Sequence, residues 1–286
     1  MKKIGIIGQG FVGKAVKESF KNYYEIFTFD KDKRKSNTDD IKKLINECRI
    51  IFTCLPTPMN ENGSCYLDIV EGVLKEINTH CDEYDFYGLE QRTIIIKSTV
   101  PPGTTERWNK EYKYLNIAFN PEFLTEANAI DDFKNQNKII IGSTRKVGSV
   151  VKSLYSKVFP KVPVIKTSAT IAEMVKYFTN TFLSTKVSFA NEMYQICEKL
   201  DIDYDKVVEY AKYDERIGYS HLNVPGPDGD FGFGGHCFPK DLNALIHLAE
   251  KHGLGLDINV LRATLETNNK VRNNRDWEQQ KGRAVV

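Results

Sequence analysis

The chain has 286 residues, 41% of them hydrophobic, so it is long enough for one large or two ordinary domains. Lys and Arg number 40 against 38 Asp and Glu, and the net charge of +2 argues against nucleic-acid or membrane-surface binding, which needs a concentrated basic field. No apolar run approaches the ~18 residues of a membrane span, and the start MKKIGIIG has no separate leader segment. Six scattered cysteines without a C-x-x-C pair suit the reducing cytoplasm, and the five histidines predict no metal site.

The first part of the chain, up to about residue 166, alternates short apolar runs with amphipathic stretches. This alternation is typical of βαβ units and of a parallel sheet. The apolar runs predict strands over residues 4–7, 26–29, 50–53, 93–97, 117–119, 138–141 and 162–165. The amphipathic stretches predict helices over residues 12–20, 41–46, 69–78 and 147–157.

The second part of the chain has a helical pattern. From Thr170 to Leu200 no Gly or Pro interrupts the apolar spacing, which predicts one long helix capped by Ser168. Further helices are predicted over residues 203–212, 241–252 and 258–273, with a loop rich in Gly and Pro over residues 218–235. We therefore predict an α/β fold with a doubly wound parallel sheet in residues 1–166, an all-helical domain in 167–274 and a polar tail in 275–286.

The segment G-x-G-x-x-G at residues 8–13 follows a predicted strand and opens a predicted helix. Gly8 would permit the tight turn, Gly10 the approach of a pyrophosphate, and Gly13 close packing of the helix on the strand. The helix N-terminus would offer N–H groups and partial positive charge to phosphates. Asp30 ends the next strand, where a carboxylate would bind a ribose 2′-hydroxyl and repel a 2′-phosphate, so NAD is favoured over NADP. The alternative is a glycine-rich turn that binds no ligand.

The segment GFGGHCFPKD, residues 232–241, places Cys237 between a run of glycines and a predicted helix. The glycines would let backbone N–H groups approach a substrate, while the helix dipole and Lys240 would favour a thiolate. Asp241 could orient Lys240 or a water molecule. Taken alone, such a cysteine is more often structural, and His236 is too close along the chain to act with it.

Two pairs of polar residues strengthen a catalytic interpretation. Glu122 and Glu126 follow a predicted strand, where open α/β sheets gather ligands, and they would share one face if this segment is helical. Lys176 and Asn180 are four residues apart on the long predicted helix, in an apolar neighbourhood. A shielded lysine there can stabilise an alkoxide or act as a base. Each pair alone fits a solvated helix face, but with the cysteine loop they predict an active site.

These motifs resemble those of the UDP-glucose/GDP-mannose dehydrogenase family over roughly residues 1 to 274. The matching segments are GQGFVG, LPTP at 55–58, KSTVPPG at 97–103, NPEFLTEA at 120–127, EMVKYFTN at 173–180, DERIG at 214–218 and GFGGHCFPKD. The resemblance implies a Rossmann-type NAD-binding domain followed by an all-helical domain like the C-terminal one of 6-phosphogluconate dehydrogenase. It also implies a homodimer and a nucleotide-sugar substrate, with a UDP-sugar favoured.

The resemblance implies a four-electron oxidation of the sugar C6 alcohol to a carboxylate. A first hydride transfer to NAD gives an aldehyde, Cys237 attacks it, and a second transfer leaves a thioester that water hydrolyses. Lys176 and Asn180 would stabilise the oxyanions, Asp241 and Thr99 would position water, and Glu122 would act as the base. The implied catalytic residues are thus Cys237, Lys176, Asn180, Glu122, Asp241 and Thr99.

The resemblance also implies which residues bind the two ligands. Those implied for the cofactor are Gly8, Gln9, Gly10, Phe11, Val12, Gly13, Asp30, Lys35, Thr57, Ser98, Glu126 and Lys240. Those implied for the sugar nucleotide are Glu122, Phe123, Leu124, Lys176, Asn180, Arg216, Phe231, Gly232, Phe233 and Gly234. Arg216 would reach the substrate of the partner subunit across the dimer.

Typical members of the family continue into a second Rossmann-like domain that holds much of the nucleotide. The short chain could be a minimal enzyme, an enzyme completed by a separate chain, or a truncated form with weak substrate affinity. We favour the first explanation, because the sequence ends in a hydrophilic segment rather than within a strand. We also hypothesise that the loop at residues 219–230 replaces part of the nucleotide-binding surface.

Two other functions remain open on sequence alone. A two-electron dehydrogenase of the 3-hydroxyacid or 6-phosphogluconate type would use the helical Lys and Asn but needs no cysteine nucleophile. A non-catalytic NAD-binding module would regulate or scaffold a partner and needs none of these side chains. Within the favoured function, the sequence does not separate UDP-glucose from GDP-mannose, UDP-galactose or an N-acetyl sugar nucleotide.

Overall fold

The computed structural model describes residues 2–83, 91–255 and 257–286. The chain divides into two compact units, the first made of Met1–Thr57 and Leu67–Lys176, the second of Pro58–Tyr66 and Tyr177–Val286. This division differs from the predicted one at residue 166, because the chain passes between the units within the long helix α7 (Ala169–Lys199).

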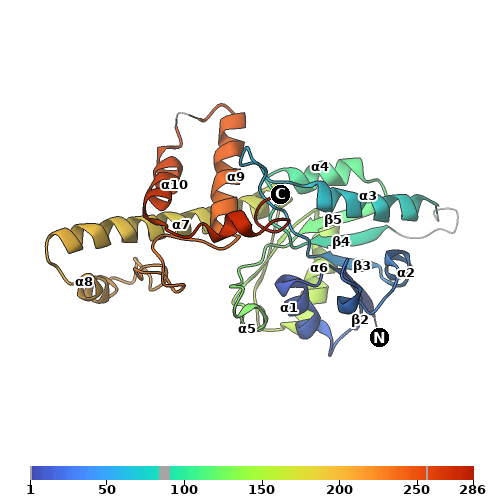
Figure 1. Cartoon of the computed structure of the whole chain (residues 1–286). Helices are drawn as coiled ribbons and strands as arrows, with labels where there is room; N and C mark the ends of the chain where they lie inside the picture. The colour runs from blue at the N-terminus through green and yellow to red at the C-terminus, as the bar shows by residue number, and fades with distance from the viewer. Residues whose placement is uncertain (1, 84–90, 256) are drawn as a thin grey trace. The chain divides into compact units, whose positions relative to one another are not determined.

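The first unit contains a seven-stranded sheet with strand order β2-β1-β3-β4-β5-β6-β7 (Figure 1). Its strands are β1 (Lys3–Ile7), β2 (Glu25–Phe29), β3 (Ile50–Thr53), β4 (Arg92–Ile96), β5 (Leu115–Phe119), β6 (Ile139–Gly142) and β7 (Val164–Thr167). Neighbouring strands are parallel except β5 and β6, which meet antiparallel at Phe119 and Gly142. The predicted α/β class with a Rossmann-type sheet is confirmed, and the order changes direction between β1 and β3, where such sheets bind ligands.

Helices cover both faces of this sheet. They are α1 (Phe11–Phe20), α2 (Ile41–Glu47), α3 (Asp68–Glu83), α4 (Thr104–Glu111), α5 (Ala129–Lys134) and α6 (Arg145–Val158), with a 3-10 turn η1 (Lys33–Lys35). Helices α4 and α5 were not predicted from the sequence. Both are short, and α4 buries a single large apolar side chain, Trp108, so neither has the repeated apolar spacing that indicates a helix.

Alternate side chains of each central strand enter different cores. In β4, Ile94 and Ile96 pack with α2, α3 and α4 on one face, while Ile95 packs with α1, α5 and α6 on the other. Both faces of the strand are therefore buried, which explains why these strands read as continuous apolar runs.

The second unit is helical. It contains most of α7 together with α8 (Tyr204–Ala211), α9 (Phe238–Lys251), α10 (Asn259–Val271) and a 3-10 turn η3 (Asp276–Gln279). Its cores are smaller: Leu242 and Ile246 of α9 pack with Phe233 and α10, and a second cluster surrounds Tyr204. Within the described residues, no helix is long and apolar enough to cross a membrane.

The predicted polar tail from residue 275 is wrong. Trp277 and Ala284 are buried, with 6% and 1% of their surface exposed. The Met59 N–H donates to the Ala284 carbonyl at 2.8 Å, and the Val286 N–H donates to the Met59 carbonyl at 3.1 Å. The segment therefore packs against residues 58–66 of the same unit. The prediction failed because a few apolar anchors in a hydrophilic segment leave no periodic pattern.

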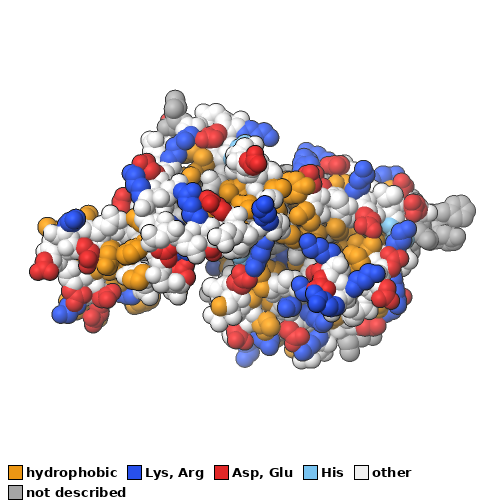
Figure 2. Space-filling model, viewed as in Figure 1, with side chains coloured by type: hydrophobic (Ala, Val, Ile, Leu, Met, Phe, Trp, Pro, Cys, Tyr) orange, Lys and Arg blue, Asp and Glu red, His pale blue; other side chains and the backbone are white. Residues whose placement is uncertain are grey.

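Helix α7 exposes a row of large apolar side chains. Phe178, Phe182 and Phe189 are 68%, 60% and 59% exposed, and the rings of Phe178 and Phe182 stack with centroids 6.3 Å apart. Leu200 extends the row at 63% exposure. Figure 2 shows hydrophobic side chains where Figure 1 places α7 and α8, as on other parts of this face, with charges of both signs among them.

Candidate active site

The glycine turn joins β1 to α1 at the carboxyl edge of the sheet. Gly8 has a φ of 89°, and an added Cβ at Gly13 would lie 1.9 Å from the Gly8 carbonyl oxygen, so both positions require glycine. Nothing in the described structure lies within 4 Å of an added Cβ at Gly10. Phe11 and Val12 form the first turn of α1, where helix N–H groups lack helical acceptors. The turn thus combines tight packing with an open face at its second glycine.

Asp30 directly follows β2 and lies beside this turn. Its carboxylate accepts the Gln9 N–H at 2.6 Å and the Asp32 N–H at 2.9 Å. Lys35, in η1, is half-exposed and lies 3.8 Å from the Asp32 carboxylate. The acid is therefore fixed at the edge where the glycine turn also opens.

Hydroxyl groups join the loops that follow β3 and β4. Thr57 Oγ1 donates to the Thr99 carbonyl at 2.8 Å, and Ser98 Oγ donates to the Leu55 carbonyl at 2.7 Å. The sequence predicts that Thr57 and Ser98 bind the cofactor and that Thr99 is catalytic. The structure places all three at the carboxyl edge of the sheet, Thr57 after β3, which neighbours β1, and Ser98 and Thr99 after β4, the next strand along.

Lys176 of α7 holds the segment that follows β5. Its Nζ donates to the Glu122 carbonyl oxygen at 2.6 Å and lies 3.2 Å from the Glu122 carboxylate, and both side chains are buried. The other carboxylate oxygen of Glu122 accepts the Leu124 N–H at 2.8 Å. Lys176 also lies over the Phe123 ring, 5.4 Å from its centroid. Four predicted substrate residues are thus in contact.

The predicted pairing of Glu122 with Glu126 on one helix face is not found. Residues 120–125 have no helical structure, and α5 begins only at Ala129. Glu122 is buried whereas Glu126 is exposed. The contacts of Glu122 explain the difference, because they hold its backbone in a non-helical conformation. Thr125 adds to this by donating to Asp132 through both its N–H and its hydroxyl.

A buried network at the ends of β4 and β5 was missed from the sequence. Lys97 Nζ and the Tyr155 hydroxyl both donate to Asn120 Oδ1, at 2.8 and 2.5 Å, and Asn120 Nδ2 donates to the Ile140 carbonyl. Burial lowers the pKa of Lys97 to about 8, against the opposing effects of Cys54 and Glu122. A lysine directly after the apolar run Ile94–Ile96 was the available signal, since lysine is rarely buried without a partner.

The second unit carries its own buried polar group. Asn180 Nδ2 donates to Asp241 Oδ2 at 2.6 Å, and Lys240 Nζ donates to Asp241 Oδ1 at 2.5 Å. Asp241 is 1% exposed, and the other two side chains are also buried. Burial lowers the pKa of Lys240, but Asp241 and the thiols of Cys65 and Cys237 raise it to a net value above the ordinary one. Lys240 therefore stays a charged ammonium that interacts electrostatically with two cysteine side chains.

Cys237 is the N-cap residue of α9, and Pro239 lies in the first turn. Its side chain is partly exposed, and its carbonyl accepts the Asp241 N–H at 2.9 Å. The partial positive charge at a helix N-terminus, together with the nearby Lys240 ammonium, favours an anion at this position. The local arrangement suits a nucleophilic thiolate.

Side-chain oxygens accept hydrogen bonds from the backbone N–H groups of the glycine loop before Cys237. Gly232 donates to Asn191 Oδ1 at 3.0 Å and Phe233 to Asn268 Oδ1 at 2.7 Å. The Phe231 carbonyl accepts from Arg272 at 3.3 Å, and Gly234 and Gly235 contact Arg272 and Asp276. The expectation that the glycines of this loop leave N–H groups open to a substrate is therefore wrong for Gly232 and Gly235, and the Phe233 N–H is also bonded. Their N–H groups fix the loop instead.

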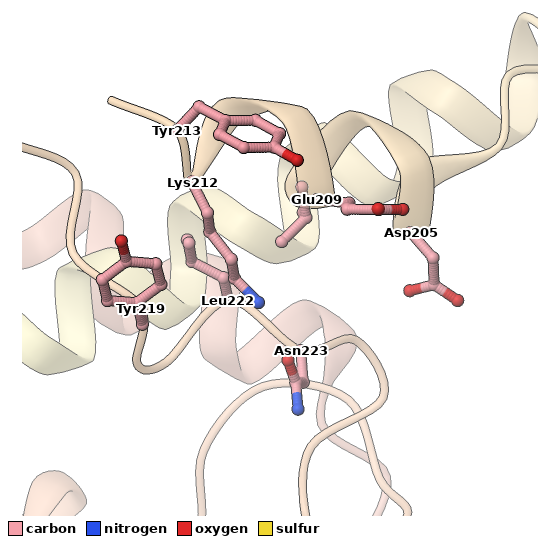
Figure 3. Close-up of a pocket in the computed structure, with 8 residues that line it drawn as sticks. Asp205, Glu209, Lys212, Tyr213, Tyr219, Leu222 and Asn223 are labelled. Atoms are coloured by element: carbon pink, nitrogen blue, oxygen red, sulfur yellow. The ribbon is translucent and has the colours of Figure 1, made fainter. Parts of the chain in front are cut away.

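Arg216 follows α8 and pairs with Asp214, with 88% of its side chain exposed. A hollow of about 450 Å³ lies nearby in the second unit, between α8 and the loop after it (Figure 3). Its lining residues are Asp205, Val208, Glu209, Lys212, Tyr213, Tyr219, Leu222 and Asn223. Three of them belong to the 219–230 loop. Among the described residues, no group of His, Cys, Asp and Glu could hold a metal ion.

Comparison with known proteins identifies related domains in both units. The NAD binding domain of the UDP-glucose/GDP-mannose dehydrogenase family matches residues 26–159, and the central domain of that family matches residues 170–270. UDP-glucose 6-dehydrogenase TuaD of Bacillus subtilis is 34% identical, over 95% of this chain and 64% of its own. The UDP-glucose 6-dehydrogenase of Rickettsia prowazekii is 36% identical, over 76% of this chain and 48% of its own.

Solved structures show the same relationship. The UDP-glucose dehydrogenase of Pyrobaculum islandicum superposes with a TM-score of 0.84 at 28% identity, over 94% of this chain and 68% of that one. The 3-hydroxyisobutyrate dehydrogenase of Mycobacterium tuberculosis has a TM-score of 0.74 at 14% identity, over 94% and 93%, a likeness of fold alone. The chain spans less than two thirds of the length of the curated relatives TuaD and YtcA of Bacillus subtilis, 64% of each.

Proposed function

Because the chain belongs to the UDP-glucose/GDP-mannose dehydrogenase family, we propose that it is an NAD-dependent nucleotide-sugar 6-dehydrogenase. UDP-glucose is the proposed substrate, since the curated relatives TuaD and that of Rickettsia prowazekii are named for it. The observation that carries the proposal is the position of Cys237 at the N-terminus of α9, beside the buried Lys240–Asp241–Asn180 group. A two-electron dehydrogenase has no use for a thiol there.

The residues of the first unit suit a bound dinucleotide. The open face at Gly10 and the N-terminus of α1 would accept the diphosphate, and Asp30 would accept a ribose hydroxyl. Bound NAD supplies the hydride acceptor for both oxidation steps. The carboxylate of Asp30 also disfavours a 2′-phosphate, which supports NAD rather than NADP.

The chain's own side chains would carry the remaining chemistry. The Cys237 thiolate adds to the C6 aldehyde, and after the second oxidation the carbon is held as a thioester. Lys176 and Asn180 would stabilise the oxyanions. Water cleaves the thioester to the carboxylate and returns the thiol, with Glu122 taking a proton from that water. The contacts of Glu122 with Lys176, and of Asn180 with Asp241, support these assignments by fixing each side chain.

The test is the number of NADH molecules formed per UDP-glucose consumed by the purified chain. Two NADH per sugar, abolished in Cys237→Ala and retained in the buried-cysteine control Cys197→Ala, is the expected result. One NADH per sugar, unaffected by Cys237→Ala, would replace the proposal with a two-electron dehydrogenase. No NADH with UDP-glucose, GDP-mannose or UDP-N-acetylglucosamine would favour a cofactor-binding module.

We further propose that the chain forms a homodimer through α7. The exposed Phe178, Phe182 and Phe189 lie on this helix, and rows of large apolar side chains in water usually mark an interface. Arg216 would then reach the substrate of the partner subunit. Its guanidinium pairs with Asp214 and is exposed, which leaves it accessible for such a contact.

We also propose that the 219–230 loop contributes to nucleotide binding. Tyr219, Leu222 and Asn223 of this loop line the hollow next to α8, and the Lys212 ammonium and the Tyr213 ring lie in the same hollow (Figure 3). Aromatic rings suit a base, and an ammonium suits a phosphate. In Tyr219→Ala the KM for UDP-glucose should rise while kcat is kept, and an unchanged KM would refute this role.

A further inference from the structure

A side chain from beyond α10 binds the backbone of the cysteine loop. Both carboxylate oxygens of Asp276, in η3, accept the N–H of Gly235, at 3.1 and 3.0 Å. Gly235 is two residues before Cys237. A bond to a carboxylate is stronger than one between neutral groups, so this contact constrains the loop close to the thiol.

A buried arginine fixes that carboxylate in turn. The side chain of Arg272 is 2% exposed, and its Nη2 lies 2.6 Å from Asp228 and 3.4 Å from Asp276. Its Nε lies 3.4 Å from Asp230 and its Nη1 donates to the Phe231 carbonyl at 3.3 Å. Burial opposes the charge of Arg272, but the three carboxylates raise its pKa overall, so the guanidinium stays charged.

The loop rests directly on this ion pair. An added Cβ at Gly234 would lie 2.3 Å from Arg272 Nη2 and 2.3 Å from Asp276 Oδ1. The loop at Gly234 therefore lies directly against two protein side chains. Any larger residue would displace either the loop or the ends of the Arg272 and Asp276 side chains.

The turn that carries Asp276 is itself anchored. Trp277 is buried beside it, and Gln280 Nε2 donates to Asp276 Oδ2 at 3.3 Å. Further along, Ala284 and Val286 form backbone hydrogen bonds with Met59. These contacts fix the position of the turn, so the Asp276 carboxylate can hold the loop in place.

We propose that Arg272 and Asp276 are positioning residues that hold the 232–237 loop so that the Cys237 thiol stays at the N-terminus of α9 and near Lys240. The claim that this positioning promotes catalysis rests on the proposed function. The claim that it makes the thiol more reactive does not, because a thiol at a helix terminus near an ammonium reacts faster with electrophiles whether or not the chain turns over a sugar.

The test is the rate of Cys237 alkylation by iodoacetamide in the full chain, followed by mass spectrometry of the Cys237 peptide from pH 6 to pH 9. In Asp276→Ala the rate at pH 7 should fall by about twofold to fivefold, the range expected for losing a helix-terminus interaction, and the profile should move to higher pH. Asp276→Asn keeps one acceptor for Gly235 and should give an intermediate rate.

The matched control is Glu278→Gln, two residues further along η3, where Glu278 pairs with exposed Arg275. In this variant Cys237 should be alkylated at the same rate as in the parent chain. A folded Asp276→Ala or Asp276→Asn with the parent rate and pH profile would overturn the proposal. If Asp276→Ala does not fold, the rate of Cys237 alkylation in Asp276→Asn tests the proposal instead. A chain that makes no NADH but shows these alkylation changes would refute the dehydrogenase function and leave the positioning intact.

Discussion

The carboxylate of Glu173 binds the start of another helix through two backbone N–H groups. Glu173 Oε1 accepts the Thr105 N–H at 2.8 Å, and Oε2 accepts the Gly103 N–H at 2.7 Å, with the side chain fully buried. The acid lies in the first part of α7, three residues before Lys176. It thereby connects two sequence motifs, KSTVPPG and EMVKYFTN, that carry separate catalytic candidates.

Replacing Glu173 by Gln should destabilise the chain. The amide offers one acceptor oxygen in place of two, so a buried N–H at the start of α4 loses its partner, at a cost of about 1–3 kcal/mol. Urea unfolding would measure this. Glu198→Gln, at an exposed position on the same helix, is the control and should change the free energy of unfolding by less than about 0.5 kcal/mol. Equal stabilities for both variants would contradict the capping role of Glu173.

Lys97 should make stability depend on pH. Its pKa is about 8 in the folded chain against 10.5 for the ordinary side chain. Between these values the unfolded chain holds a proton that the folded chain lacks, so the free energy of unfolding rises with pH. Below about pH 8 both states are charged, and this stabilisation is lost.

Replacing Lys97 by Met removes that dependence. From pH 7.5 to pH 10, the free energy of unfolding of the parent chain should rise relative to that of Lys97→Met, by at most about 3 kcal/mol. Lys152→Met, an exposed position on α6, is the control and should show a constant difference. Denaturant unfolding at several pH values measures both, and parallel curves for Lys97→Met would contradict the lowered pKa.

Gly13 should be essential for NAD binding. In Gly13→Ala the new Cβ would meet the Gly8 carbonyl oxygen at 1.9 Å, so the turn between β1 and α1 must open. We expect NAD affinity to fall by at least about tenfold, which corresponds to 1.4 kcal/mol. Isothermal titration with NAD is the measurement. Gly72→Ala is the control, because nothing lies within 4 Å of its added Cβ among the described residues, and it should leave NAD affinity unchanged.

Phe182→Glu should disrupt the proposed dimer. A carboxylate in the middle of the exposed apolar row would have to be desolvated in any interface there. Light scattering at micromolar concentration should report a dimer for the parent chain and a monomer for Phe182→Glu, while the exposed control Lys199→Glu stays dimeric. A monomeric parent chain would end both the dimer proposal and the assignment of Arg216 to a partner's substrate.

The sheet could be predicted because its strands are buried on both faces. Runs such as Ile94–Ile95–Ile96 are apolar throughout, and the structure contains all seven predicted strands within two residues of their predicted bounds. The irregular segment around Glu122 could not be predicted, since its conformation depends on Lys176, which lies far along the chain.

Side-chain networks were harder to predict than elements. The contact of Asn180 with Asp241 joins two motifs that were each recognised, yet their proximity is a property of how α7 packs on α9. Lys97 and Tyr155 meet at Asn120 from three separate segments, and only the folded chain brings them together. The packing of Trp277 was missed for the same reason.

The pairing of Met59 with Ala284 and Val286 has a consequence for how the chain folds. It joins segments that are far apart in the sequence, and contacts of such large sequence separation slow folding. The second unit cannot be complete until residue 284 has been synthesised, even though residues 58–66 emerge early. A fragment beginning at residue 177 would lack that segment, and we expect it to leave Ala284 uncovered and to aggregate when expressed alone.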